Sequence, residues 1–523
     1  MTTVSLDGES LTPEDVAAAV RDGVTVEVPE SARERVREAR ERVVDVVESG
    51  EAVYGLNTGF GELVNERIPR EKIEELQTNL IRSHSAGSGR ECTEEEVRAM
   101  LLTRINALVK GYSGVREELV DHLVTLLNEG VHPVVRSRGS LGASGDLAPL
   151  AHMALVLLGE GEADYQGERY DGADALAMVD LDPLSLAPKE GLALINGTQL
   201  TVGKAALAVV DAENLVQAAD AAGALTTEVT MGTTASCTPA IHEVRPHPGQ
   251  AASARNVRKL CADSEIVESH RNCDRVQDAY AIRCLPQAHG AVRDAVAHVR
   301  EAVEIELNSA TDNPLVFDAS DVDDRASGTD RAAIVSGGNF HGAPLAHRLD
   351  YLTAVMTDLA SICERRVDRL VNPNLQEDHL PPFLTAQSGL RSGYMIAQYT
   401  AAALVNECRS LGRAATDNTP VSGGQEDHVS MSAQAAHHAT TAVDHAATVV
   451  GVELLCATQA LDFVDEALEP GAGTRAVAEA VREIAPPLDD DRVLSPELDR
   501  AAALARGGLL GERLAAAVGT ELE

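Results

Sequence analysis

The stretch GSLGASGDLAPLAH, from Gly139 to His152, is the most specific feature of this chain. Small residues surround its central tripeptide, Ala143-Ser144-Gly145, so the backbone can bend tightly there without Cβ clashes. Such a tripeptide can close on itself when the amide nitrogen of Gly145 attacks the carbonyl carbon of Ala143 and water leaves. Loss of the Ser144 hydroxyl as a second water then gives an imidazolone with an exocyclic methylene, an electrophile that no ordinary side chain supplies.

Two other roles fit the residues of this stretch less well. A phosphate-binding loop would continue into Gly-Lys-Ser/Thr or show the glycine spacing of a dinucleotide fingerprint, and neither follows. A hydrolase nucleophile at Ser144 would need glycine two residues away on each side; Gly142 fits and Asp146 does not. Because Ala-Ser-Gly alone is usually only a tight turn, the prediction of a cyclised tripeptide depends on the whole stretch and on motifs elsewhere.

The charge balance argues against nucleic acid as a partner. The chain has 44 Lys and Arg against 82 Asp and Glu, a formal charge of −38 at pH 7, whereas phosphate binding needs a basic surface. The acidic residues are spread along the chain and lysine is scarce. This pattern favours a protein of a salt-rich cytoplasm, because salt screens the self-repulsion of so many charges; an ordinary acidic protein is the alternative.

Targeting, membrane and metal signals are absent from the sequence. The N-terminal residues lack the basic and apolar regions of a signal peptide, and no apolar run reaches membrane-spanning length. The eight cysteines form no Cys-x-x-Cys pair, as expected for reduced cytosolic thiols. His437, His438 and His445 lack the carboxylate or thiol spacing of a metal site. We expect a cytoplasmic protein without membrane association, bound metal or nucleotide.

Helical periodicity dominates the pattern of apolar residues. Val36, Ala39, Val43 and Val47 recur at helical spacing, and similar patterns cover residues 101–108 and 115–126. Long proline-free stretches rich in Ala, Leu and Val follow in the second half, at residues 345–372, 383–419 and 421–469. A helix of about thirty residues is about 45 Å long, and apolar helices of that length pack as bundles, often across subunits. The sequence predicts a mostly helical chain with a weak boundary near residues 200–215.

Further motifs complete a pattern that covers nearly the whole chain. They are YGLNTGFG (54–61), NLIRSHSAG (79–87), LINGTQ (194–199), VQDAYAIRCLPQAHG (276–290), ELNSATDNP (306–314), SGGNFHG (336–342), GLRSGYMIAQYTAAAL (389–404) and GGQEDHVSM (423–431). Together with residues 139–152 they resemble the aromatic amino acid ammonia-lyase family. Ser83-His84 and the QEDHVSM segment are similar to the members that act on histidine rather than on phenylalanine or tyrosine.

The resemblance implies a fold, a cofactor and a reaction. The fold is a fumarase/aspartase-like bundle of long helices over residues 211–523, with a smaller N-terminal domain, residues 1–210, that carries the reactive loop. The cofactor is MIO, 4-methylidene-imidazol-5-one, formed autocatalytically from Ala143-Ser144-Gly145. The reaction removes ammonia from L-histidine to give trans-urocanate, in a homotetramer whose active sites are shared between subunits.

Other activities stay open at this point. A phenylalanine or tyrosine ammonia-lyase, or an aminomutase, would use the same electrophile. An inactive helical scaffold and a serine hydrolase at Ser144 are alternatives of other classes.

The resemblance also implies roles for individual residues. A base must remove the weakly acidic β-proton of the substrate; Tyr54 is the first candidate, with Tyr280 and Glu426 as the others. His84 and Glu426 would contact the substrate imidazole, because a carboxylate accepts an imidazole N–H and stabilises its charged form. Phe340 would pack beside the substrate. Asn196 is assigned by the family alone, near the electrophile and the substrate carboxylate.

Three residues of the 276–290 motif follow one another at intervals of three. On a helix Gln277, Tyr280 and Arg283 would share one face and could point into one pocket. Arg283 would bind the substrate carboxylate through its fork of N–H groups; a surface salt bridge is the alternative.

The sequence departs from the expected family pattern at two places. Gly423-Gly424 replaces an Ala-Asn pair, and Ala279 replaces a proline. Both could change loop stiffness without removing a catalytic group.

Overall fold

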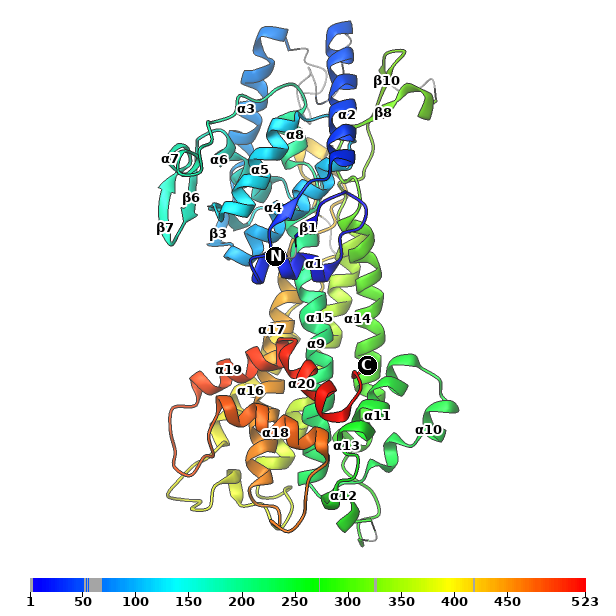
Figure 1. The fold of residues 1–523 in the computed structure, drawn as a ribbon, viewed down its shortest axis with the longest axis vertical. Helices are drawn as coiled ribbons and strands as arrows, with labels where there is room; N and C mark the ends of the chain where they lie inside the picture. The colour runs from blue at the N-terminus through cyan, green and yellow to red at the C-terminus, as the bar shows by residue number, and fades with distance from the viewer. Residues whose placement is uncertain are drawn as a thin grey trace. The chain divides into compact units, whose positions relative to one another are not determined.

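The computed structural model describes residues 3–50, 53, 55, 68–271, 273–323, 327–416 and 419–523. The described residues form mainly helices, with strands of at most four residues in small two- and three-stranded sheets (Figure 1). The prediction of a mostly helical chain with long helices is confirmed.

The chain divides into two compact units. Unit 1 contains Met1–Leu207, Arg300–Asp350 and Arg413–His437, and unit 2 contains Ala208–Val299, Tyr351–Gly412 and His438–Glu523. Four of the five boundaries between the units fall within long helices, and the fifth lies between Gly412 and Arg413. The helices are α9 (Gln199–Val229), α14 (Leu285–Leu307), α15 (Ala343–Val371) and α17 (Ser432–Leu461). The domain boundary near residue 210 stays a prediction.

Unit 1 carries eight shorter described helices and all the described strands. The helices are α1 (Pro13–Arg21), α2 (Glu30–Ser49), α3 (Ile73–His84), α4 (Glu94–Val109), α5 (Glu117–Glu129), α6 (Leu147–Leu157), α7 (Gly172–Ala177) and α8 (Glu190–Ile195). The strands are β1 (Val4–Ser5), β2 (Val26–Glu27), β3 (Ser88–Glu91), β4 (His132–Pro133), β5 (Arg136–Arg138), β6 (Glu162–Tyr165), β7 (Glu168–Asp171), β8 (Leu315–Asp318), β9 (Ser327–Gly328) and β10 (Ala332–Val335).

Unit 2 carries the remaining described helices. They are α10 (Pro239–Glu243), α11 (Pro248–Leu260), α12 (Glu265–Ser269), α13 (Tyr280–Arg283), α16 (Met395–Ser410), α18 (Ala472–Ile484), α19 (Ser495–Arg506) and α20 (Leu509–Val518). The proline-free stretch 383–419 yields only α16, so the sequence overestimated the length of that helix.

Local signals explain where helices begin and end. Thr12 and Thr93 start α1 and α4 with capping boxes, in which the threonine and the acidic residue three positions later exchange hydrogen bonds with each other's backbone. Gly50 and Gly130 end α2 and α5 in the left-handed conformation that glycine adopts without strain.

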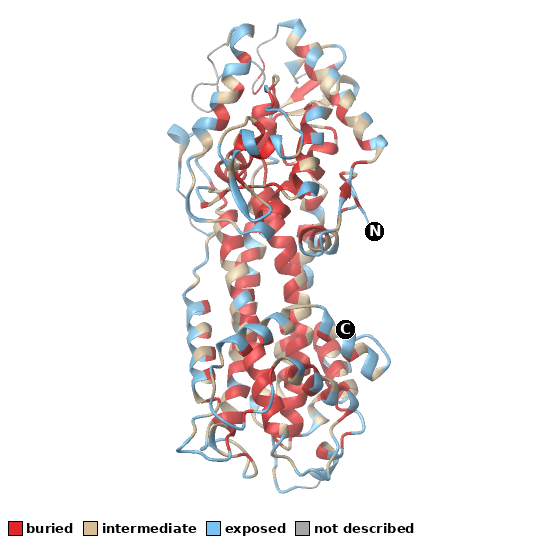
Figure 2. Ribbon diagram, turned by 60° about the vertical axis from the view of Figure 1, so that its left-hand side comes forward, coloured by how far each residue is buried: buried red, intermediate tan, exposed pale blue. Residues whose placement is uncertain are grey.

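Burial is most continuous along the long helices (Figure 2). α9 has 31 residues and is buried on nearly all sides, as expected of a core helix that is apolar all round. In unit 1, β8 pairs with β10 in antiparallel register, with Val316 opposite Ile334. Both side chains pack with Val43 and Val46 of α2 in a buried apolar cluster.

Candidate active site

The tripeptide Ala143-Ser144-Gly145 lies in the turn between β5 and α6. Gly142 and Gly145 have φ of +65° and +74°, the left-handed region that favours glycine. A Cβ atom on Gly145 would lie 2.2 Å from the carbonyl oxygen of Gly197. The sharp bend predicted from the small residues is therefore present, and Gly145 has no room for a side chain.

One side of the tripeptide contacts the turn between α8 and α9. The Asn196 side chain donates from Nδ2 to the Ser144 carbonyl oxygen at 2.7 Å. The Asp146 backbone N–H donates to the Gly197 carbonyl oxygen at 2.6 Å. Asn196, placed here by the family resemblance alone, thus contacts the tripeptide directly.

The other side contacts two segments distant in sequence. The Gly142 carbonyl oxygen accepts hydrogen bonds from the Ser430 hydroxyl at 2.8 Å and from the Gly342 N–H at 3.1 Å. The Met431 N–H donates to the Leu141 carbonyl oxygen at 2.7 Å. The motifs 336–342 and 423–431 therefore meet at the tripeptide.

Asp146, directly after the tripeptide, is fully buried. It accepts hydrogen bonds from the Ser140 hydroxyl at 2.8 Å and from the Thr201 N–H at 2.8 Å. Burial raises the pKa of Asp146, and these hydrogen bonds partly oppose that shift. No sequence pattern assigns Asp146 a role, and its position next to Gly145 is the one signal that points to it.

Glu426 contacts the reactive serine, and its charge acts on His84. The Ser144 hydroxyl donates to Glu426 Oε1 at 2.6 Å, across 282 positions of sequence. His84, at the end of α3, is half-buried, and its Nδ1 lies 2.8 Å from the Leu80 carbonyl oxygen. Because a carbonyl only accepts, Nδ1 carries the proton and Nε2 keeps a lone pair. Burial lowers the pKa of His84, and the Glu426 charge acts in the opposite direction.

Phe340 belongs to the same part of unit 1. It is half-buried and stands two residues before Gly342, whose N–H contacts the loop of the tripeptide.

The predicted trio Gln277, Tyr280 and Arg283 belongs to unit 2, and only two of its members meet as expected. The Arg283 guanidinium carbon lies 4.6 Å from the centre of the Tyr280 ring, at cation–π distance. Gln277 precedes α13 in an irregular, exposed segment, so the prediction of one helical face is wrong for this residue. Arg283 forms no salt bridge with any other described residue, and its Nε is buried without a hydrogen-bond partner among them.

Tyr54 and most of the 54–61 motif lie outside the described residues. Within the described ranges no three His, Cys, Asp or Glu side chains are grouped as a metal site would require. Of the histidines His437, His438 and His445, His437 has its Nε2 atom 2.7 Å from the Ser137 carbonyl oxygen. None of the helices in the described ranges is long and apolar enough to cross a membrane.

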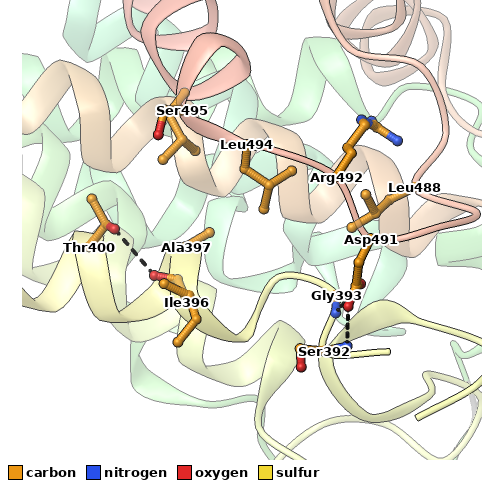
Figure 3. A pocket seen from close by; sticks show the side chains of 11 residues that line it. Ser392, Gly393, Ile396, Ala397, Thr400, Leu488, Asp491, Arg492, Leu494 and Ser495 are labelled. Carbon is orange, nitrogen blue, oxygen red and sulfur yellow. Dashed lines mark hydrogen bonds between the residues drawn. The ribbon is translucent and has the colours of Figure 1, made fainter. Parts of the chain in front are cut away.

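Unit 2 also contains a pocket of about 290 Å³ between α16 and the start of α19 (Figure 3). Its walls include Ile396, Leu488 and Leu494. Its carboxylate, Asp491, already accepts the N–H groups of Ser392 and Gly393, at 2.8 and 3.0 Å. The other charged side chain of its lining, Arg492, pairs with Glu497 at 2.6 Å. Both charged groups of this pocket are therefore engaged, and it is not the catalytic candidate.

Comparison with known proteins decides the family. A model of the aromatic amino acid lyase family matches residues 11–483. The chain belongs to the aromatic amino acid lyase family. The family assignment made from the motifs is confirmed.

Relatives within the family cover the full chain. The chain is 62% identical over 524 residues to the probable histidine ammonia-lyase of Halobacterium salinarum, with 100% of both sequences covered. Among solved structures it is similar to histidine ammonia-lyase from Trypanosoma cruzi, with a TM-score of 0.88, 40% identity, and 98% of this chain and 95% of that chain covered. It is also similar to tyrosine aminomutase from Streptomyces globisporus, with a TM-score of 0.92, 37% identity and 100% of both chains covered.

Proposed function

We propose that this chain is a carbon–nitrogen lyase that removes ammonia from L-histidine to give trans-urocanate, using MIO formed from Ala143-Ser144-Gly145. The observation that carries the proposal is the contact of the Ser144 hydroxyl with Glu426 at 2.6 Å, inside a turn that admits only glycine at position 145. The 62% identical relative named probable histidine ammonia-lyase supports the choice of histidine.

The residues around the tripeptide suit ring formation. A Cβ on Gly142 would lie 2.2 Å from the Ser432 hydroxyl oxygen, and one on Gly145 equally close to Gly197. The loop is therefore packed closely against Ser432 on one side and Gly197 on the other, which holds it in the bent conformation that ring closure requires. MIO formed from Ala143-Ser144-Gly145 would supply an electrophilic carbon, the chemistry that lets a poor leaving group such as an amine depart.

Glu426 and His84 are suited to recognising an imidazole. Loss of the Ser144 hydroxyl as water would remove the donor that Glu426 now holds, leaving the carboxylate free to accept a substrate N–H. His84 uses Nδ1–H on the Leu80 carbonyl, so Nε2 is available as a second acceptor. Two acceptors fit the two N–H groups of a charged imidazole ring, which phenylalanine and tyrosine do not have.

Arg283 and Tyr280 would bind the carboxylate end of the substrate, with Gln277 beside them. Arg283 offers a charged fork that carries no salt bridge with the other described residues. Tyr280 is 72% exposed, and its ring lies 4.6 Å from the guanidinium carbon of the half-buried Arg283. In the proposed homotetramer they complete an active site shared between subunits, where Asn196 and Phe340 also line the substrate and Tyr54 removes the β-proton.

The surface charge supports a salt-rich cytoplasm as the working environment. With 82 acidic residues against 44 Lys and Arg, self-repulsion is strong in dilute buffer and is screened by salt. We expect the thermal midpoint of unfolding to rise as potassium chloride is raised to molar concentration.

A substrate panel tests the activity. Purified protein in molar potassium chloride is mixed with L-histidine, L-phenylalanine or L-tyrosine, and ammonia and near-UV absorbance are followed. We expect both signals with L-histidine alone. Turnover of tyrosine or phenylalanine instead would favour the aminomutase or the other lyases, and no turnover in folded protein would favour the inactive scaffold.

Two serine variants complete the test. Ser144→Ala should keep the fold and lose activity with every substrate. Ser137→Ala is the matched control, because its hydroxyl is buried in β5 and has no partner among the described side chains. Full activity in Ser144→Ala would overturn the proposed mechanism.

A further inference from the structure

A buried arginine stands behind the turn that contacts the tripeptide. Arg104, on α4, is fully buried in unit 1. Its Nη1 donates to the Asn196 carbonyl oxygen at 3.0 Å and to Gln199 Oε1 at 2.8 Å. The Gln199 side chain in turn donates to the Thr311 hydroxyl at 2.8 Å. None of the motifs considered above contains Arg104.

The charge of Arg104 lacks a direct counterion among the described residues. Burial lowers its pKa to about 10, so the guanidinium stays charged at neutral pH. The acid that acts on it electrostatically, Asp312, already pairs with Lys189 at 2.5 Å. Nε and Nη2 of Arg104 have no hydrogen-bond partner in the described part of the chain. Because burying a cation in this way costs free energy, Arg104 is better explained by a role other than stability.

Arg104 connects to the reactive tripeptide through one residue. Its guanidinium holds the backbone carbonyl of Asn196, and the Asn196 side chain donates to the Ser144 carbonyl oxygen at 2.7 Å. The next residue, Gly197, is packed so tightly that a Cβ there would lie 2.6 Å from Arg104 Nη1. The position of the Asn196 amide relative to Ser144 therefore depends on Arg104.

Ring closure is favoured by a hydrogen-bond donor at the Ser144 carbonyl oxygen. The Gly145 nitrogen forms a bond to the Ala143 carbonyl carbon, and the Ala143 oxygen leaves as water with the protons of the Gly145 and Ser144 amides. The Ser144 Cα proton and hydroxyl leave as the second water, so no oxidant is required. As the Gly145 amide loses its proton, negative charge spreads onto the Ser144 carbonyl oxygen, where a preorganised N–H stabilises it.

We propose that Arg104 is a positioning residue for ring closure: it fixes Asn196 so that its amide donates to the Ser144 carbonyl oxygen, and its positive charge favours the anion that forms there. This inference rests on the proposed cyclisation of Ala143-Ser144-Gly145.

The test follows the intact mass of the full-length chain at intervals after its synthesis is stopped. Arg104→Met should slow the loss of two waters by about tenfold or more, the effect of losing a hydrogen bond from a charged donor. Arg104→Lys, which keeps the charge but not the fork, should fall between Arg104→Met and the native chain.

The matched control is Arg98→Met. Arg98 lies on the same helix, is buried, and donates to the backbone carbonyls of Leu127 and Ala19, away from the tripeptide. We expect both methionine variants to lower the thermal midpoint and only Arg104→Met to slow cyclisation.

Three results would overturn the inference. The first is native cyclisation kinetics in folded Arg104→Met, or in folded Arg104→Lys should the methionine variant not fold. The second is equal slowing in Arg98→Met, which would indicate a general effect of packing. The third is a native chain that retains both waters, which would overturn the proposed cofactor as well.

Discussion

Two buried regions of this chain are held together in different ways. In unit 1 most contacts of the tripeptide turn are made to its backbone, by groups such as the Gly197 carbonyl, the Ser430 hydroxyl and the Asn196 side chain, and the Glu426 carboxylate accepts from the Ser144 hydroxyl. In unit 2 a cluster of charged side chains lies beneath α13. Arg366 donates to both oxygens of Glu453, at 2.5 and 2.9 Å, and both side chains are fully buried.

The charged cluster extends to the turn that carries Tyr280 and Arg283. Arg366 Nη1 lies 3.2 Å from His289 Nε2 and donates to the Ala281 carbonyl oxygen at 3.2 Å. Because Arg366 can only donate, His289 Nε2 accepts, and its Nδ1–H donates to Asp220 at 2.8 Å. The comparison teaches that a segment which reacts with itself needs a fixed backbone shape, whereas a turn that presents a charged side chain can be held by charges.

The largest expected effect is the loss of activity when Gly145 is replaced. In Gly145→Ala the new Cβ would meet the Gly197 oxygen at 2.2 Å, and φ is +74°. We expect ring formation to fail and activity to fall by about 10³-fold or more, as when the reacting group of a catalytic unit is removed. Peptide mass and ammonia release check this result.

Gly167→Ala separates conformational strain from crowding. Gly167 has φ of +83°, and a methyl group added there would meet no atom within 4 Å. This variant should therefore lose only about 1 kcal/mol of stability and keep its ring. Equal activity in both alanine variants would show that the contact with Gly197 is unimportant.

The next largest effect is a loss of stability when the charged cluster of Arg366 and Glu453 is broken. Glu453→Gln leaves the Arg366 cation buried without its partner, and we expect a loss of about 3–5 kcal/mol in the free energy of unfolding. Replacing both residues with methionine should recover much of that loss, because neither charge then needs compensation. Denaturant titration in molar salt measures both variants; a double variant as unstable as Glu453→Gln would contradict this account of the cluster.

A smaller, pH-dependent effect is expected at His437, next to the loop of the tripeptide. Burial, with Lys204 and Arg138 nearby, lowers the pKa of His437 to about 3 from its ordinary 6.5. The unfolded chain therefore binds a proton below about pH 6.5 that the folded chain does not, so stability falls as pH drops from 6.5 towards 3.

His437→Gln tests this pH dependence. Glutamine can still offer an N–H to the Ser137 carbonyl oxygen but does not titrate. The thermal midpoint of the variant should decline less steeply than that of the native chain between pH 6.5 and pH 4, where glutamate carboxylates still contribute equally to both. Parallel declines would rule out a neutral His437 in the folded chain.

The smallest effect is expected at Ala279, where the family pattern has proline. Ala279 has φ of −57°, close to the angle that proline imposes, and its N–H donates to no other described residue. Ala279→Pro should therefore raise the free energy of unfolding by about 0.4–1 kcal/mol, because proline lowers the conformational entropy of the unfolded chain. A thermal midpoint below that of the native chain would show that the N–H or the space around it is needed.

Much of the architecture was predictable because it depends on local patterns. The spacing of Val36, Ala39 and Val43 marks α2, and the proline-free stretches mark α15 and α17. The sharp bend at the tripeptide was predictable because small residues flank Ala143-Ser144-Gly145 on both sides. Its partners Asn196 and Glu426 were expected only through the family resemblance, and the contact with Ser430 was not expected. Glu426 and Ser430 lie nearly 300 positions from the tripeptide, and no local rule links them to it.

The errors have physical causes as well. Gln277 was assigned to a helical face by its spacing, but α13 is a single turn that begins only at Tyr280. The sequence does not predict the burial of Arg104 and Arg366, because a charged residue on a helix is usually exposed, and only the packed structure shows that both are buried.

One measurement tests the central proposal most directly: the mass of the tryptic peptide Gly139–Arg169, compared with the rate of ammonia release from L-histidine in the same preparations. We predict that this peptide lacks two waters, and that specific activity rises in proportion to the fraction of chains carrying the loss. Rapid release of ammonia by protein whose peptide retains both waters would contradict the account.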